Sequence, residues 1–385
     1  MSSNENNLNN VKEKVKNEVR NQLDIVKNML EGRSDTQVRE WTGKIDKPHN
    51  RIVFGAPGTG KSHRINIDIK ENNLNKLFKR VTFHPNYTYS QFVGSYKPIS
   101  KIINESGSEK EVISYEFVAG PFLNVLIEAL KDENAGVPHL LVIEEINRAN
   151  PAAVFGDIFQ LLDRNYEGKS SYTINMSDEM RKYVCNKLKK NIDELYIPNN
   201  MYIWSTMNSA DQGVYPMDSA FKRRWSFEYI GIDENQEQLK GKIYEFIKLK
   251  NENGGYTTFE WNKVRTTINE KLKKGKVNED KLLGPFFLSE SELLKSNENN
   301  KKFDDIFKSK VLMYLYEDIL KHKKIDFFIG ELQTLSDIME AYDKGKIFNF
   351  EIEKASELTY EKKEEDSIEE NTRVAEEQSL FESEG

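Results

Sequence analysis

Residues 51–62 read R-I-V-F-G-A-P-G-T-G-K-S, and this stretch decides the fold. An apolar strand candidate leads into a glycine-rich turn, after which Lys61 and Ser62 open a helix. The spacing G-x-x-x-x-G-K-[ST], placed between a strand and a helix, predicts a loop that binds a phosphate chain. The residues predicted to form this loop are Gly55, Ala56, Pro57, Gly58, Thr59, Gly60, Lys61 and Ser62.

Each residue type in the loop has a physical reason to be there. Glycine lets the backbone adopt conformations that a Cβ would obstruct, so that successive N–H groups can point inward at a phosphate chain. Lys61 is expected to neutralise the β- and γ-phosphates, and the Ser62 hydroxyl to hold Mg²⁺. The helix that follows presents the positive end of its dipole to the anion.

A second apolar run ends in two adjacent carboxylates. Residues 139–150 read H-L-L-V-I-E-E-I-N-R-A-N, and a buried strand tolerates charge only at its tip, where metal or water solvates it. We expect Glu144 to contribute to the Mg²⁺ shell and Glu145 to orient and polarise an attacking water. The alternative is a solvated acidic loop, which fits poorly with so apolar a strand.

A third strand-like run, within residues 201–225, ends at an amide and is followed by two arginines. The run M-Y-I-W-S-T-M-N ends at Asn208, whose amide can donate to a γ-phosphate or hold the attacking water. Further along, Arg223 and Arg224 end a helix-like segment from which a guanidinium can reach a phosphate in an adjacent subunit. A surface salt bridge or a charge at a helix C-terminus is the alternative for either arginine.

These motifs lie in a stretch, from residue 50 to about 230, that alternates short β-branched or aromatic runs with longer helical segments. The alternation predicts an α/β fold with a parallel five-stranded sheet flanked by helices. The expected strands are Arg51–Gly55, Arg80–His84, His139–Glu144, Met201–Thr206 and Trp225–Tyr229.

The rest of the chain divides by composition. Residues 1–47 predict a disordered start and an amphipathic helix that packs on the domain behind it or docks on a partner. Residues 48–231 form the expected nucleotide-binding domain, and residues 232–350 a second, mostly helical domain with amphipathic segments such as Lys308–Lys321. Residues 351–385 form an acidic tail with too few apolar side chains to offset the entropy of ordering. The basic stretch within residues 165–200 fits a solvated surface helix, with a pore lining or a partner surface as alternatives.

Overall composition excludes several classes of protein. The 385 residues carry 56 Lys and Arg against 63 Asp and Glu, a net charge of −7 that argues against coating nucleic acid with the whole surface. The single cysteine, Cys185, excludes an intrachain disulfide framework and a multi-cysteine zinc site. Mean hydropathy is −0.70 and no apolar run approaches the roughly 20 residues that cross a bilayer, which predicts a cytoplasmic protein with no membrane partner.

Taken together, these residues resemble the AAA+ ATPase family, and within it the McrB-like branch, whose prototype is the motor subunit of modification-dependent restriction systems. The likeness covers about residues 48–230. It is carried by F-H-P-N-Y-T-Y-S-Q-F-V-G-S-Y-K-P at 83–98, E-E-I-N-R-A-N at 144–150 and T-M-N-S-A-D at 206–211, with looser matches at L-L-G-P-F-F-L, 282–288, and at Lys308–Phe328. The resemblance implies a helical lid as the second domain, Asn208 as sensor 1, Arg223 or Arg224 as the finger acting in trans, and Arg148 as another interface arginine.

The same resemblance implies partners and a nucleotide. It implies a homo-oligomer, a hexameric ring by family habit, that uses Mg²⁺ and either ATP or GTP. The branch prototype hydrolyses GTP, most AAA+ proteins use ATP, and family base rates favour ATP. A separate McrC-like, nuclease or recognition subunit is implied, with DNA reached through the complex, in a restriction or anti-phage defence system. The alternative is a nucleotide-switched scaffold or remodelling chaperone that assembles an effector without translocating DNA.

Two residues depart from the branch pattern. The branch usually carries Asp where this chain has Glu144, and the longer arm is expected to shift the metal contact. It usually carries Arg where this chain has Gln212, in a loop that the family links to activation by a partner. For sensor 2 the sequence offers only Lys281 as a placeholder.

Overall fold

The computed structural model describes residues 45–105, 108–208, 213–321, 323, 325–330 and 334–355. The predicted N-terminal helix and the acidic tail beyond residue 355 lie outside the described residues. Within the described part, no helix combines the length and the apolar character that crossing a bilayer requires.

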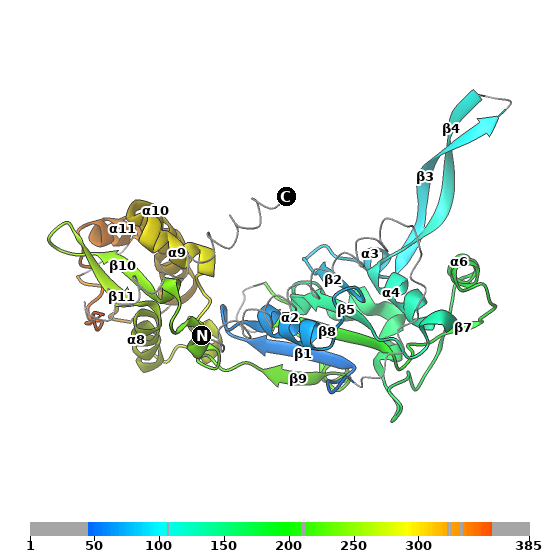
Figure 1. Cartoon of the computed structure of the whole chain (residues 1–385), viewed down its shortest axis with the longest axis horizontal. Helices are drawn as coiled ribbons and strands as arrows, with labels where there is room; N and C mark the ends of the chain where they lie inside the picture. Colours follow the sequence, from blue (N-terminus) through cyan, green and yellow to red (C-terminus); the bar gives the residue numbers. More distant parts are fainter. Residues whose placement is uncertain are drawn as a thin grey trace, which may run out of the picture. The chain divides into compact units, whose positions relative to one another are not determined.

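A parallel five-stranded sheet with the order β2-β5-β8-β1-β9 forms the centre of the first half of the chain (Figure 1). Its strands are β1 (Asn50–Gly55), β2 (Phe78–Thr82), β5 (His139–Glu144), β8 (Met201–Asn208) and β9 (Ser226–Tyr229). All five expected strands are confirmed. Several boundaries differ by one or two residues: β2 starts earlier than predicted because Phe78 pairs with Leu140, and β8 runs on to Asn208 opposite Gly55.

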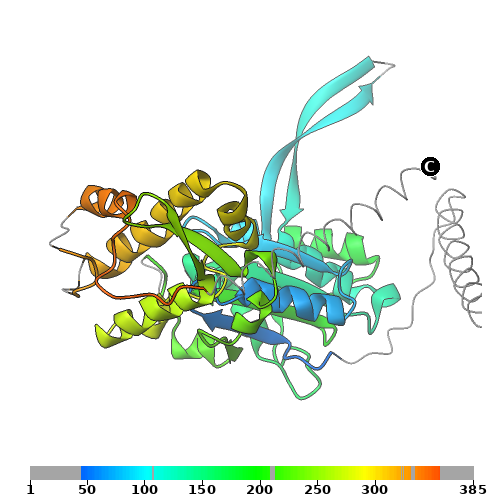
Figure 2. The same ribbon diagram turned by 60° about the vertical axis from the view of Figure 1, so that its left-hand side comes forward.

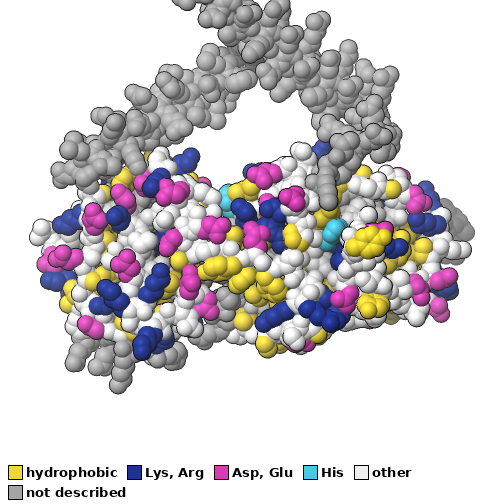
Figure 3. All heavy atoms as spheres, turned by 90° about the horizontal axis from the view of Figure 1, so that it is seen from below, with side chains coloured by type: hydrophobic (Ala, Val, Ile, Leu, Met, Phe, Trp, Pro, Cys, Tyr) yellow, Lys and Arg dark blue, Asp and Glu magenta, His cyan; other side chains and the backbone are white. Residues whose placement is uncertain are grey.

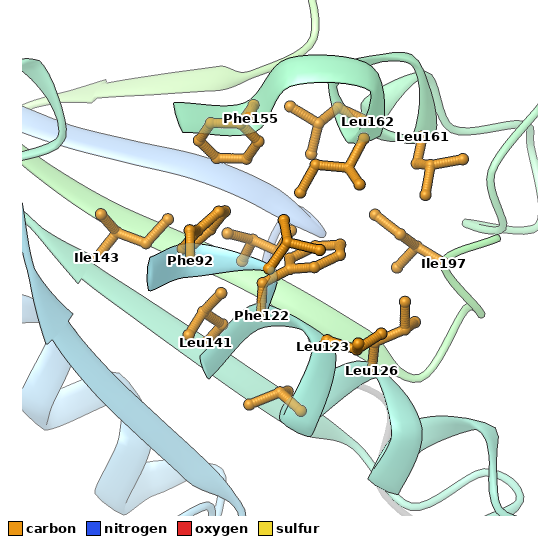
Figure 4. Packing of buried hydrophobic residues seen from close by; sticks show 14 of the residues in the cluster. Phe92, Phe122, Leu123, Leu126, Leu141, Ile143, Phe155, Leu161, Leu162 and Ile197 are labelled. Atoms are coloured by element: carbon orange, nitrogen blue, oxygen red, sulfur yellow. The ribbon is translucent and has the colours of Figure 1, made fainter. Parts of the chain in front are cut away.

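Helices cover both faces of this sheet. α2 (Lys61–Glu71) and α4 (Pro121–Leu130) contact its strands directly. The other helices of this half are α3 (Tyr89–Phe92), α5 (Pro151–Phe155), α6 (Asp178–Leu188) and α7 (Ser219–Lys222). Side chains of a strand alternate between the two faces. Leu141 and Ile143 of β5 therefore pack with Phe92, Phe122 and Phe155 in a dry core on one face (Figure 4), while α2 lies against the other.

A long antiparallel hairpin, β3 (Gly94–Glu105) and β4 (Ser108–Ala119), was not predicted from the sequence. In both Figure 1 and Figure 2 it projects away from the sheet. Tyr96 and Tyr115 stack on it with ring centroids 6.1 Å apart, yet remain 57% and 61% exposed.

The basic segment within residues 165–200 contains α6, flanked by the short strands β6 (Ile174–Asn175) and β7 (Glu194–Leu195). Met180 and Val184 are its buried side chains, whereas most of its charged side chains are exposed. α6 is therefore a surface helix that packs on the rest of the protein through one narrow stripe of apolar side chains.

The second half of the chain is helical, as expected, with one small sheet added. Its elements are β10 (Phe246–Lys250), β11 (Tyr256–Glu260), α8 (Trp261–Lys274), α9 (Glu290–Glu298), α10 (Asn300–Ile306) and α11 (Leu335–Asp343). After α10 the chain continues through the π-helical turns Phe307–Leu312 and Leu315–Leu320, which bury Val311, Leu312 and Leu315. These turns cover the segment predicted as an amphipathic helix. The domain boundaries at residues 231 and 350 stay predictions.

Arg51 ties the strand before the glycine-rich loop to its neighbours. Its side chain is 1% exposed, and it donates to Asp68 of α2 (2.6 Å) and to Glu228 of β9 (2.7 Å). Its guanidinium lies 5.3 Å from the ring centroid of Trp204. Removing one partner of a buried ion pair leaves an uncompensated charge, which costs more than the intact pair contributes.

We expect Arg51→Met to lower the free energy of unfolding by about 3–5 kcal/mol, because Asp68 is then buried without its main partner. Urea denaturation measures the change. Arg64→Met is the matched control, since Arg64 also contacts Glu228 (3.1 Å) but is 39% exposed, and should cost about 1 kcal/mol or less. Equal losses in the two variants would contradict this account of the buried network.

Candidate active site

The predicted site residues come from three neighbouring strands. β1 ends at Gly55, β5 at Glu144 and β8 at Asn208, and Gly55 lies opposite Asn208 in the register. Because the carboxyl ends of parallel strands meet at one edge of a sheet, the glycine-rich loop, the carboxylates and the amide converge there.

The glycine-rich loop is closed on one side by the second domain. Gly58 has φ +73°, a conformation that favours glycine, and a Cβ there would meet the backbone nitrogen of Phe287 at 2.3 Å. The amides of Gly284 and Phe286 donate to the carbonyl oxygens of Pro57 (2.9 Å) and Gly58 (2.8 Å). A trans peptide directs its N–H opposite to its C=O, so the N–H groups that follow these carbonyls point away from the second domain.

Helix α8 holds this closing segment in place. Asn269 bonds both the N–H (2.8 Å) and the C=O (2.9 Å) of Leu283, the residue before Gly284. Arg265, which is fully buried, donates to Asp233 at 2.7 Å. Burial lowers the pKa of Arg265, and the Asp233 carboxylate opposes that shift. The segment 282–288 was identified as a motif from the sequence, but its contact with the glycine-rich loop was not predicted.

Lys61 begins α2 directly after the loop. Its side chain is folded back, and Nζ donates to the carbonyl oxygens of Gly55 (3.1 Å) and Ala56 (2.9 Å). Gly60, at the helix N-cap, has no side chain to satisfy the first N–H groups of α2. The ammonium group and the helix N-terminus together make this end of the loop an anion site.

Glu144 lies at the centre of a polar cluster. Its Oε2 accepts hydrogen bonds from the hydroxyls of Ser62 (2.9 Å) and Thr206 (2.5 Å), and its Oε1 accepts from Arg80 at 2.7 Å. Ser62 and Glu144, which were each predicted from the sequence to hold Mg²⁺, are therefore in direct contact in the structure. Thr206 begins the T-M-N-S-A-D motif but was not assigned a role in the site, and Arg80 belongs to none of the motifs.

The donor set fits a magnesium ion bound together with a polyphosphate. The described residues contain no group of three or more His, Cys, Asp or Glu side chains placed to hold a metal. Mg²⁺ in phosphate-transfer sites needs no such cage, since it keeps several waters and takes its other ligands from one or two protein oxygens and the phosphates. The Ser62 hydroxyl and the Glu144 carboxylate, 2.9 Å apart, supply oxygen donors of that kind.

Glu145, the residue after β5, has a backbone conformation that differs from that of the strand. Its φ is +57°, a left-handed conformation that is uncommon for a residue with a Cβ. The Asn208 amide donates to Glu145 Oε1 at 2.7 Å, and the Glu145 N–H donates to the Thr206 hydroxyl at 3.1 Å. Asn147 in turn donates to the Asn208 carbonyl at 2.7 Å. The predicted base and the predicted sensor amide are thus in direct contact.

The two adjacent arginines have different surroundings. The Arg224 side chain is 9% exposed, pairs with Asp163 at 2.6 Å, donates to the Ala220 carbonyl (2.7 Å) and lies 4.0 Å from the ring centroid of Phe159. The Arg223 side chain is 67% exposed, and its distance to Asp163 is 4.0 Å. The sequence does not distinguish the two arginines, whereas in the structure Arg224 is held by Asp163, Ala220 and Phe159 and Arg223 is exposed to solvent.

Of three other residues named from the sequence, Arg148 contacts the predicted base, Lys281 lies in the second domain, and Gln212 is outside the described residues. Arg148 is 49% exposed, and its Nε lies 3.4 Å from the Glu145 carboxylate. Lys281 donates to the Asp318 carbonyl at 3.4 Å. Gln212 belongs to residues 209–212, outside the described part of the chain.

Charge is mixed on the face of the molecule that Figure 3 shows. On the face seen in Figure 3, basic and acidic side chains lie among hydrophobic ones, with neither sign forming a continuous stripe. This agrees with the small net charge of the sequence.

Comparison with known proteins gives three findings. A family model described as AAA domain (dynein-related subfamily) matches residues 50–225. The Type II restriction enzyme BsuMI component YdiS of Bacillus subtilis (strain 168) is 45% identical over 328 residues, covering 80% of this chain and 90% of that protein. The Type IV methyl-directed restriction enzyme EcoKMcrB subunit of Escherichia coli (strain K12) is 29% identical over 210 residues, covering 52% of this chain and 40% of that protein.

Proposed function

This chain belongs to the dynein-related subfamily of AAA domains and is a McrB-like AAA+ ATPase. From this premise we propose that it is the Mg²⁺-dependent, oligomeric motor subunit of a restriction system. The observation that carries the proposal is the convergence, at one edge of the sheet, of Lys61 with the Ser62–Glu144 and Glu145–Asn208 pairs. The names of the two relatives support the assignment to restriction.

The chemistry follows from these positions. The loop amides and Lys61 bind the β- and γ-phosphates, with Lys61 leaving the loop carbonyls that it contacts in this structure. Mg²⁺, when bound beside Ser62 and Glu144, neutralises phosphate charge. Glu145 accepts a proton from the attacking water, and Asn208, which already touches Glu145, orients that water or the γ-phosphate.

The substrate is a purine nucleoside triphosphate, with ATP favoured over GTP on family base rates. The site residues named above are expected to bind the phosphates and the cation rather than the base, so hydrolysis assays with both nucleotides decide between ATP and GTP. We propose that the protein acts in the cytoplasm, as a ring, with a separate McrC-like, nuclease or recognition subunit through which it reaches DNA.

Steady-state turnover with and without DNA and with and without the partner subunit tests the motor assignment. A motor is expected to be stimulated when its load is present. Slow turnover that neither DNA nor the partner changes would favour the alternative, a scaffold that assembles on triphosphate and is reset by hydrolysis. Absence of Mg²⁺-dependent hydrolysis of any purine triphosphate would overturn both.

We assign the trans-acting finger to Arg223, because its guanidinium is free to reach an adjacent subunit, and an anchoring role to Arg224. Arg223→Ala subunits should bind triphosphate normally and lose turnover on the order of 10³-fold, the usual contribution of an arginine finger. Arg224→Ala should instead lower the melting temperature, because Asp163 loses its 2.6 Å partner. Turnover, equilibrium binding and thermal unfolding of both variants measure these effects.

Mixing two inactive variants distinguishes the loss of an arginine that acts on the adjacent subunit from a defect within the same subunit. Arg223→Ala and Lys61→Ala subunits, each inactive alone, should together regain part of the activity, since some interfaces then pair an intact loop with an intact finger. Specific activity of the unmodified protein should rise with concentration as rings form. If Arg224→Ala alone abolishes turnover while folding normally, the two roles are reversed.

A further inference from the structure

The Glu144 carboxylate is already paired with a protein cation, Arg80 of β2. We infer that Arg80 is a positioning residue that competes with the divalent cation for Glu144, and so sets the Mg²⁺ concentration at which the triphosphate binds. The inference rests on the proposed function, because it assumes that this edge of the sheet binds a triphosphate with Mg²⁺.

Arg80 is held in place by contacts on both sides of its guanidinium. Nη1 donates to Glu144 Oε1 at 2.7 Å, and Nη2 donates to the Asn66 side chain on α2. The guanidinium also lies 5.8 Å from the ring centroid of Phe78. Its side chain is 29% exposed and that of Glu144 is 13% exposed, so the pair is partly withdrawn from solvent. These contacts fix the charge of Arg80 beside the carboxylate.

The two carboxylate oxygens of Glu144 are divided between two sets of donors. Oε2 accepts from the Ser62 and Thr206 hydroxyls and faces the glycine-rich loop, whereas Oε1 accepts from Arg80. A cation beside Ser62 therefore meets a carboxylate whose negative charge is already shared with a guanidinium.

The length of the Glu144 side chain makes this pairing possible. With the backbone unmoved, an aspartate carboxylate at this position would end about 1.5 Å nearer the strand, the length of one C–C bond. Such a carboxylate could not keep both the 2.9 Å contact to Ser62 and the 2.7 Å contact to Arg80. Glu144, which stands where the McrB-like pattern usually has aspartate, is thus long enough to contact Ser62 and Arg80 at the same time.

Removing Arg80 is expected to change Mg²⁺ affinity through the loss of its charge and not through a displacement of Glu144. Without Arg80, Glu144 still accepts hydrogen bonds from Ser62 and Thr206, so its Oε2 stays beside the metal position. What is lost is the repulsion between a guanidinium and a divalent cation. Solvent still reaches both side chains, so a high effective dielectric applies. For charges roughly 7 Å apart, this repulsion then corresponds to about a threefold to tenfold change in Mg²⁺ affinity.

The test is a titration of Mg²⁺ against a labelled, non-hydrolysable triphosphate at fixed protein concentration. Arg80→Met should lower the half-saturating Mg²⁺ concentration about threefold to tenfold. Arg80→Gln, which keeps a hydrogen-bond donor without the charge, should follow Met, and Arg80→Lys should stay close to the unmodified protein. Arg64→Met is the control, because Arg64 lies on the same helix as Ser62 but pairs with Glu228. An unchanged or raised Mg²⁺ requirement in both neutral variants would overturn the inference.

The dependence of thermal unfolding on Mg²⁺-triphosphate supplies a second readout, because a merely structural role would lower the melting temperature equally with and without it. In EDTA without nucleotide, Arg80→Met should melt below the unmodified protein, because Glu144 then lacks any cation. Saturating Mg²⁺-triphosphate should narrow that gap, since the metal replaces the lost charge. An equal loss of melting temperature in both conditions would assign Arg80 a structural role only. If even the unmodified protein binds no triphosphate at saturating Mg²⁺, the proposed function itself fails, which is a different result from equal Mg²⁺ requirements.

Discussion

Lys61→Ala is expected to abolish tight triphosphate binding. The ammonium group is the cation that the loop itself provides, and without it the β- and γ-phosphates face only backbone dipoles. Loss of one or two charge-assisted hydrogen bonds, each contributing about 1.5–3 kcal/mol, weakens binding on the order of 100-fold or more. Equilibrium titration with a labelled triphosphate in the presence of Mg²⁺ measures the loss.

Lys70→Ala is the control for this experiment. Lys70 lies in the last turn of α2 and is exposed, so its removal takes one positive charge from the same helix without touching the loop. The Lys61 substitution should leave the fold intact, because the loop carbonyls of Gly55 and Ala56 can accept hydrogen bonds from water instead. Unchanged affinity in Lys61→Ala, with Lys70→Ala also unchanged, would remove the site from this loop.

The central sheet could be predicted from sequence because each strand has a local signal. Runs such as His139–Glu144 are apolar on both faces, as buried parallel strands must be, and end abruptly in charge. Their boundaries were less certain, since pairing with neighbours sets them: Phe78 joins β2 through its register with Leu140.

The β3–β4 hairpin could not be predicted by the same argument. Sequence patterns identify strands through the burial of one face, and neither face of the projecting part is covered. Ile102 and Ile113 are 69% and 73% exposed, so no core imposes an alternation on this segment. The small β10–β11 sheet was likewise missed within a stretch whose composition is helical.

At the site, the residues predicted from the sequence were those with a local sequence signal. Residues that reach the site only through tertiary contacts were not predicted. Glu145 and Asn208 were both predicted because each ends an apolar strand, and the parallel sheet brings those ends together. Arg80 occupies the middle of a strand and gains its role only from its distance to Glu144. The difference between Arg223 and Arg224 depends on burial, which adjacent identical residues do not reveal.

Glu145→Gln is expected to separate binding from hydrolysis. Glutamine fills the same volume, and its side-chain oxygen can still accept the hydrogen bond from Asn208, which is 2.7 Å long in the unmodified protein. The amide does not accept a proton from water, however, and loss of a general base lowers turnover about 10²- to 10⁴-fold. Nucleotide binding and assembly on triphosphate should be retained. Turnover, binding and mass measurements on the same preparation test all three expectations.

The neighbouring carboxylate supplies the comparison that locates the base. Glu144→Gln keeps the volume and the hydroxyl contacts from Ser62 and Thr206, but it removes the charge that faces the cation and Arg80. We expect its defect to appear as a raised Mg²⁺ requirement, with turnover partly recovered at high Mg²⁺, whereas no Mg²⁺ concentration should restore Glu145→Gln. Turnover near that of the unmodified protein in Glu145→Gln, together with a loss in Glu144→Gln that Mg²⁺ does not relieve, would move the base to Glu144. That outcome would also make the Glu145–Asn208 contact a structural one, because an amide could then replace the carboxylate without loss.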